Sequence, residues 1–184
     1  MNRRTMMTTL AGGVVAVGYA GRANAAPADD GKLPVASETP AKDFAGAKEL
    51  PDPNTDYKVV FSVGAKVNDD EVHPTLKLIG SYLNTLAHNG VPARHRHFAA
   101  VFHQGGGDAV LSNAVYKSRH NGVDNPNIAA LKELHDAGVE LRVCGQGLMG
   151  KNLDSSHLLP GIQVDLWAMV TMVNLQSRGY VRVG

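Results

Sequence analysis

The sequence predicts an α/β fold: a single domain with a mainly parallel, five-stranded sheet and helices on both faces. Short apolar runs rich in β-branched residues alternate with segments whose apolar residues recur every three or four positions. Glycine or proline stands at most of the junctions between these segments. Alternating strands and helices, joined by right-handed crossovers, build a parallel sheet that is covered on both sides.

Five segments have the composition of strands. Each is short, largely apolar and bounded by residues that favour turns. They are residues 58–63, 94–103, 139–143, 162–166 and 180–183. The last of them is expected at an edge of the sheet.

The segments between the strands have helical periodicity and helix-end signals. They are residues 75–89, 109–120, 127–137, a short stretch near 155–159, and 168–177. Gly90 follows the first helix as a C-cap, and Asp108 is expected to cap the second. Asn125 and Pro126 stand in the favoured order for the start of the third.

The first 25 residues have the features of an export signal. Arg3 and Arg4 precede a soft apolar stretch, residues 10–20, and Ala23-Asn24-Ala25 matches a signal-peptidase site. The paired arginines favour the twin-arginine route, although a general secretory signal has similar features. The sequence therefore predicts a periplasmic protein that is cleaved near Ala25.

The chain has 184 residues, of which about 159 remain after such a cleavage, enough for one domain. Residues 26–56 are rich in proline and alanine and have no strand or helix period, so they are expected to form a flexible arm. Residues 57–184 form the predicted α/β domain.

Composition excludes several classes of function. The net charge is +1 and no basic stripe is present, so nucleic acid is not an expected partner. Nothing after residue 25 is long and apolar enough to span a membrane. A single cysteine excludes a disulfide framework. The triple glycine at 105–107 lacks the pattern of a nucleotide loop, and no cofactor is predicted.

The one cysteine, Cys144, follows a predicted strand and precedes a glycine-rich turn at residues 145–151. Ligands of parallel sheets bind at the carboxyl ends of the strands. The residues expected to share this rim are Lys66, His103, Gly105, Gly106, Cys144, Gly145, Gln146 and Gly147. Glycine amides there would favour an anion and a thiolate, with His103 assisting. Packing remains an alternative for Cys144, because free cysteines are often buried small hydrophobes.

Three histidines, His95, His97 and His103, are expected on one face of the second strand. His97 and His103 would lie about 20 Å apart along it, too far for one metal site. A site at His95 and His97 needs ligands from elsewhere, and a solvent-facing strand start is the favoured interpretation. No metal site is predicted.

Several motifs, in this order and spacing, resemble the DsrE family of small α/β sulfur-metabolism proteins over about residues 57–183. They are the strand at 58–61, the strand ending at His103, Ala-Gly-Val-Glu-Leu-Arg-Val-Cys at 137–144, Leu-Leu-Pro-Gly-Ile-Gln-Val at 158–164, and Leu-Gln-Ser-Arg-Gly-Tyr at 175–180. The resemblance implies that Cys144 takes up sulfur as a persulfide and that the protein assembles into trimers or hexamers.

The chain departs from the resembling carriers in two ways. Those carriers are cytoplasmic, and their turn after the cysteine is rich in alanine and arginine; here the turn has one charged residue, Lys151. The predicted function is a periplasmic sulfur carrier or sulfurtransferase whose donor or acceptor is a protein or a small sulfur anion. A metal- or anion-binding protein, and a structural oligomeric subunit with a buried cysteine, are the alternatives.

Overall fold

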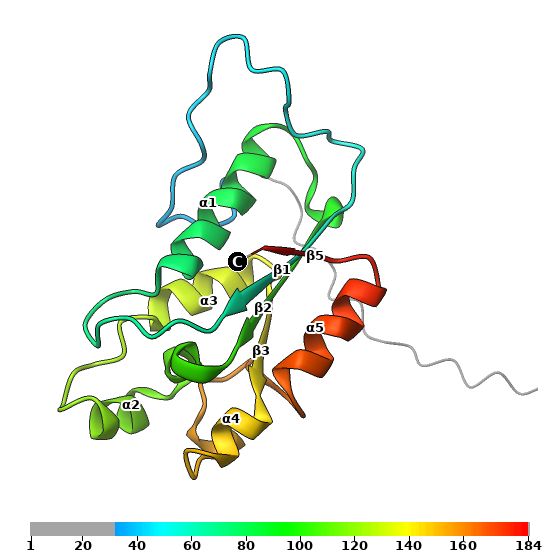
Figure 1. The fold of residues 1–184 in the computed structure, drawn as a ribbon. Coiled ribbons are helices and arrows are strands. Elements are labelled where there is room, and N and C mark those ends of the chain that lie inside the picture. The colour runs from blue at the N-terminus through cyan, green and yellow to red at the C-terminus, as the bar shows by residue number, and fades with distance from the viewer. Residues whose placement is uncertain (1–31, 184) are drawn as a thin grey trace, which may run out of the picture.

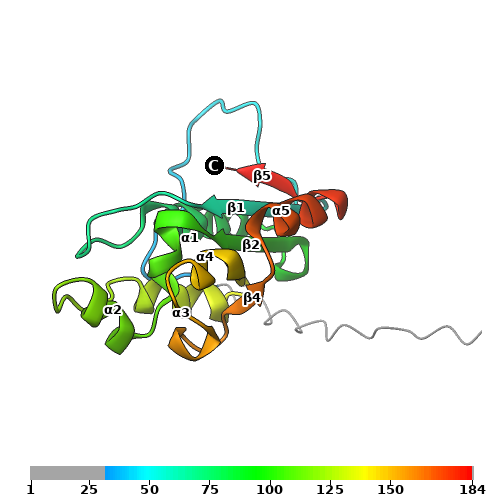
Figure 2. The same cartoon turned by 60° about the horizontal axis from the view of Figure 1, so that its bottom comes forward.

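The structure is a computed structural model that describes residues 32–183, so the predicted export signal lies outside the described residues. One sheet of five parallel strands, in the order β4-β3-β2-β1-β5, organises the chain. The strands are β1 (Tyr57–Val63), β2 (Arg96–Phe102), β3 (Glu140–Cys144), β4 (Gln163–Asp165) and β5 (Val181–Val183). Figure 2 shows β5 and β4 near opposite edges of this sheet. The predicted fold class is confirmed, including the edge position of the last strand.

Helices cover the two faces unequally. Helices α1 (Pro74–His88) and α3 (Ile128–Asp136) lie on one side of the sheet, and α5 (Ala168–Ser177) lies on the other (Figure 1). The larger core is on the α1 and α3 side, where Phe61, Phe98 and Tyr82 pack with ring centroids 5.1–6.5 Å apart. These rings contribute much of the apolar burial that stabilises the domain.

The core beneath α5 is smaller and contains the cysteine. Because side chains alternate along a strand, Leu141 and Val143 of β3 point toward the larger core while Cys144 points the other way. Small side chains on the neighbouring strands, such as Ala99, let α5 approach closely. The fold therefore places Cys144 at the carboxyl end of β3, on the α5 side.

Two predicted segments differ from the structure. The helix expected over 109–120 is broken into a 3-10 helix, η2 (Gln104–Val110), and the short helix α2 (Asn113–Arg119). Buried Leu111 forms an isolated bridge with Leu158, and the Ser112 N–H donates to the His157 carbonyl. This long-range backbone pairing interrupts the helix, and Asp108 does not cap it.

The turn expected at 145–151 begins with a helix, α4 (Gly145–Met149). Leu148 buries its side chain in the larger core, and its carbonyl accepts the N–H groups of Lys151 and Leu153. Burial of this one leucine accounts for a helix that its glycine neighbours disfavour.

Smaller differences occur elsewhere. A 3-10 helix, η1 (Ala93–His95), precedes β2, so the strand begins at Arg96 and His95 does not share its face with His97. The short helix predicted near 155–159 is the 3-10 helix η3 (Ser155–His157). Among residues 32–183, no helix combines the length and apolar character needed to cross a membrane.

The segment expected as a flexible arm has no helix or strand over residues 32–56, yet part of it is docked. We call residues 32–41 the strap. Val35 is 1% exposed, and buried Asn84 of α1 bonds to the backbone of Val35 and Glu38. Residues 42–50 are exposed and belong to the wide loop that projects from the body in Figure 1.

Candidate functional site

Cys144 is the last residue of β3, and its side chain is 5% exposed. Its Sγ accepts a hydrogen bond of 3.4 Å from the backbone N–H of Ala168, the first residue of α5. The amide end of a helix carries partial positive charge. The thiol therefore faces an environment suited to a negatively charged sulfur.

The first two residues of α4 hold the α5 junction beside the thiol. A Cβ at Gly145 would lie 2.9 Å from the Asp165 carbonyl oxygen, so only glycine permits this close approach. The N–H of Gln146 donates to the Leu166 carbonyl at 3.3 Å. The backbone N–H of Gln146 is therefore used in this hydrogen bond. The backbone N–H that contacts the sulfur belongs to Ala168 of α5.

A small cavity of about 10 Å³ borders the thiol, at the lower limit for one water molecule. The structure brings three of the predicted site residues together around it: Cys144, His103 and Gly147. The remaining lining residues are Phe102, Gln104, Gly107, Val143, Leu148 and Lys151. Among them is the charged Lys151, which was predicted in the turn after Cys144 but not at the site.

His103 lies directly after β2, and its Nε2 is 2.9 Å from the hydroxyl of Ser62. Burial lowers the pKa of His103 below its ordinary value, and the nearby charge of Arg182 lowers it further. The imidazole is therefore neutral near pH 7. Gly64 makes room for it, because a Cβ there would meet the His103 ring at 2.5 Å.

Lys66, Gly105 and Gly106 do not line the cavity at the thiol. They line a second cavity, of about 20 Å³, between η2 and the loop after β1. A Cβ on Gly105 would lie 2.7 Å from the Lys66 backbone nitrogen. These glycines let η2 pack against the end of β1.

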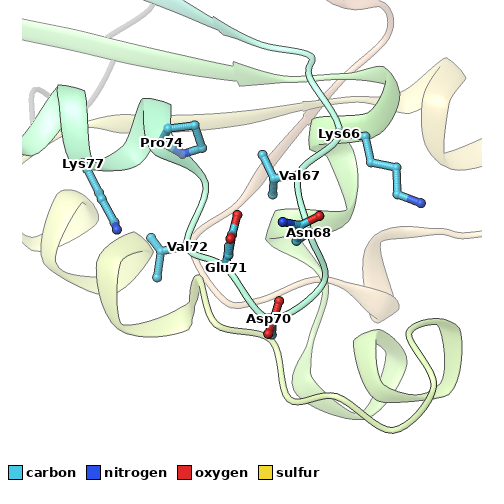
Figure 3. Close-up of a pocket in the computed structure, with 8 residues that line it drawn as sticks. All are labelled: Lys66, Val67, Asn68, Asp70, Glu71, Val72, Pro74 and Lys77. Carbon is cyan, nitrogen blue, oxygen red and sulfur yellow. The ribbon is translucent and has the colours of Figure 1, made fainter.

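A broad open hollow lies under the β1–α1 loop. Its lining residues are Lys66, Val67, Asn68, Asp70, Glu71, Val72, Pro74 and Lys77 (Figure 3). Lys66 points away from Asp70 and Glu71 in this view. The hollow is separate from the thiol cavity, with which it shares no lining residue.

The histidines do not gather into a metal centre. His95 Nδ1 and His97 Nε2 lie 3.3 and 3.6 Å from the carboxylate of Asp56. Among residues 32–183, no group of three or more His, Cys, Asp or Glu side chains has a metal-binding arrangement.

The order and spacing of these elements match a known family. Residues 66–183, which include every strand after β1 and all the residues around the thiol, match the model of the DsrE/DsrF-like family. The chain belongs to the DsrE/DsrF-like family. DsrE membership supports a function of the sulfur-relay type.

A solved structure shares the fold of this DsrE-family chain. It is a protein of unknown function, MTH1491 from Methanobacterium thermoautotrophicum, with a TM-score of 0.50 and 21% sequence identity. The match covers 70% of this chain and 98% of that chain. At this identity the likeness establishes the fold alone. No curated protein matches the chain.

Proposed function

We propose that this DsrE-family protein is a sulfur carrier in which Cys144 takes up sulfane sulfur as a persulfide. The observation that carries the proposal is the position of the thiol: its Sγ lies against the first N–H of α5, and it borders a small cavity that His103 and Lys151 also line. A thiolate and a terminal persulfide sulfur are both anions, and the amide end of a helix stabilises either one.

The uptake step is a nucleophilic displacement. The thiolate attacks the outer sulfur of a donor, the donor's sulfur–sulfur bond breaks, and its leaving group departs with the electron pair. Attack requires loss of the thiol proton. His103 is neutral near pH 7 and lines the same cavity, so we assign it the role of proton acceptor.

The burial of the thiol favours a second candidate, in which Cys144 only packs beneath α5. Cys144 is 5% exposed and shares a core cluster with Met172 and Leu175. A carrier must expose the sulfur when it meets a donor. Opening of the short helix α4, which begins directly after Cys144, would do so at the cost of removing Leu148 from the larger core.

Incubation with polysulfide, followed by an intact mass, tests the carrier. We expect wild type to gain the mass of one sulfur atom, reversibly with a reductant, and Cys144→Ser to gain none. His103→Gln should load more slowly. No gain by wild type, or an equal gain by Cys144→Ser, would refute the proposal. A thiol that reacts with an alkylating reagent only after denaturation would support the packing role.

We also propose that the protein is a homo-oligomer, a trimer or a hexamer, that assembles through α5. This helix has no charged residue, and its outward side chains Met169, Val170 and Val173 are 42–62% exposed. Exposed Leu166 and Trp167 extend the same apolar surface. Such a surface is typical of protein interfaces.

Light scattering tests the assembly. We expect wild type to be oligomeric and Val173→Asp to be a monomer that keeps its fold. Leu78→Asp, on the exposed surface of α1, is the matched control and should assemble normally. A monomeric wild type at micromolar concentration would contradict this expectation.

Export to the periplasm completes the proposal, and it rests on the sequence of the first 25 residues. A mature N-terminus close to Ala26 in a periplasmic fraction would support it. An uncleaved chain that stays in the cytoplasm would oppose it.

A further inference from the structure

Lys151 is held beside the thiol cavity by two oxygen acceptors. Its Nζ lies 2.6 Å from Asp108 Oδ1 and 3.0 Å from the carbonyl oxygen of Gln104. Lys151, Gln104 and Cys144 all line the cavity of about 10 Å³. An ammonium group has three N–H donors, so these two contacts leave one for a ligand.

The acceptor carbonyl belongs to a residue with an unusual backbone. Gln104 has a φ of +48°, in the left-handed region that side chains other than glycine rarely adopt. Such conformations cost free energy and are concentrated at functional sites. Here the conformation occurs at the residue whose carbonyl oxygen accepts from Lys151.

Asp108 is itself fixed on its other side. Its Oδ2 lies 3.4 Å from Nε2 of His120, whose Nδ1 lies 2.8 Å from Asp69. His120 is 8% exposed, and its ring stacks on that of Tyr116 at 3.9 Å. Asp108 thus contacts Lys151 through one carboxylate oxygen and lies near His120 through the other.

We propose that Lys151 binds the anionic end of the sulfur donor, so that the protein selects a sulfane-sulfur oxyanion of the thiosulfate type. This inference rests on the proposed carrier function. Lys151 keeps its bonds to Asp108 and the Gln104 carbonyl and donates its third N–H to an oxygen of the donor's sulfonate end. The cavity must widen for this, since its present volume does not hold the donor.

The transfer balances in atoms and charge. The Cys144 thiolate attacks the outer sulfur of thiosulfate, and the sulfur–sulfur bond of the donor breaks. Sulfite leaves with the electron pair and both of its negative charges, and the persulfide keeps one. Lys151 binds the end of the donor that becomes sulfite, where negative charge increases as the bond breaks.

Thiosulfate binding to Cys144→Ser, measured by calorimetry, tests the site without the chemistry. We expect Lys151→Met in this background to weaken binding about tenfold to a hundredfold, as for loss of a charged hydrogen bond. Lys117→Met is the matched control, since Lys117 of α2 pairs with Asp124 at 3.0 Å, outside the site. Equal binding by the two lysine variants, or no binding by Cys144→Ser itself, overturns the inference.

Sulfur loading of chains that keep Cys144 separates this inference from the carrier function. Lys151→Met should load about tenfold more slowly than Lys117→Met from thiosulfate, but equally fast from an uncharged organic trisulfide. Wild type that loads from neither donor refutes the carrier function, while Lys151-dependent thiosulfate binding would still support the anion site. Equal loading of both variants from thiosulfate refutes the role of Lys151 alone.

Discussion

Gly106→Ala is expected to lower the free energy of unfolding by about 2–4 kcal/mol, the range for overpacking combined with a strained backbone hydrogen bond. A Cβ at Gly106 would lie 2.3 Å from the carbonyl oxygen of Val63, and the Gly106 N–H donates to Gly64 at 3.3 Å. The Cβ would meet a backbone carbonyl, and the hydrogen bond joins two backbone groups. A side-chain rotation therefore cannot relieve the clash, and η2 must move away from β1.

Gly107→Ala is the matched control for this experiment. It is the same substitution at the next residue of η2, also buried, but its nearest new contact is Lys151 Nζ at 3.7 Å, an ordinary distance. Urea denaturation of the two variants should show a large loss for Gly106→Ala and less than about 1 kcal/mol for Gly107→Ala. If the two variants lost similar amounts of unfolding free energy, η2 would not be packed against β1 as the structure shows.

Asn84→Ala is expected to release the strap and to cost about 2–4 kcal/mol, because buried polar backbone groups lose their partners. Asn84 is fully buried. Its Oδ1 accepts from Val35 N at 3.0 Å, and its Nδ2 donates to the carbonyls of Val35 and Glu38 at 2.7 and 2.6 Å. The methyl group of alanine cannot form any of these three hydrogen bonds.

Hydrogen exchange and denaturation together test this expectation. In Asn84→Ala the Val35 amide should lose its protection and the strap should become sensitive to protease, while β2 stays protected. Asn89→Ala is the control on the same helix: Asn89 Nδ2 donates to the Thr85 carbonyl at 2.8 Å and does not contact the strap. A strap that stays protected in Asn84→Ala would contradict the anchoring role of Asn84.

Local patterns were sufficient for the regular elements of this fold. The spacing of Leu76, Ile79, Leu83 and Leu86 predicted a helix over 75–89, and the structure has α1 at Pro74–His88. The helix predicted over 168–177 coincides with α5. These segments could be predicted because their apolar period and end residues agree with their tertiary positions.

Local patterns failed where distant contacts decide the conformation. The periodicity of 109–120 gives no sign that Leu111 pairs with Leu158, forty-seven residues later, and this bridge divides the expected helix. Glycines at 145 and 147 indicated a turn, but burial of Leu148 stabilises a helix there. The docked strap depends on Asn84, a lone polar residue whose partners lie about fifty residues away.

The sequence by itself determined the α/β class, the family likeness and the place of Cys144 at a strand end, because these depend on periodicity and on the order of motifs. The tertiary structure decided which groups surround the thiol. The backbone N–H of Ala168 contacts the sulfur, and Lys151 lines the cavity beside it. The predicted site residues Lys66, Gly105 and Gly106 line a second cavity instead. The physical reason is that strand crossovers and η2 packing, which no local pattern encodes, set these distances.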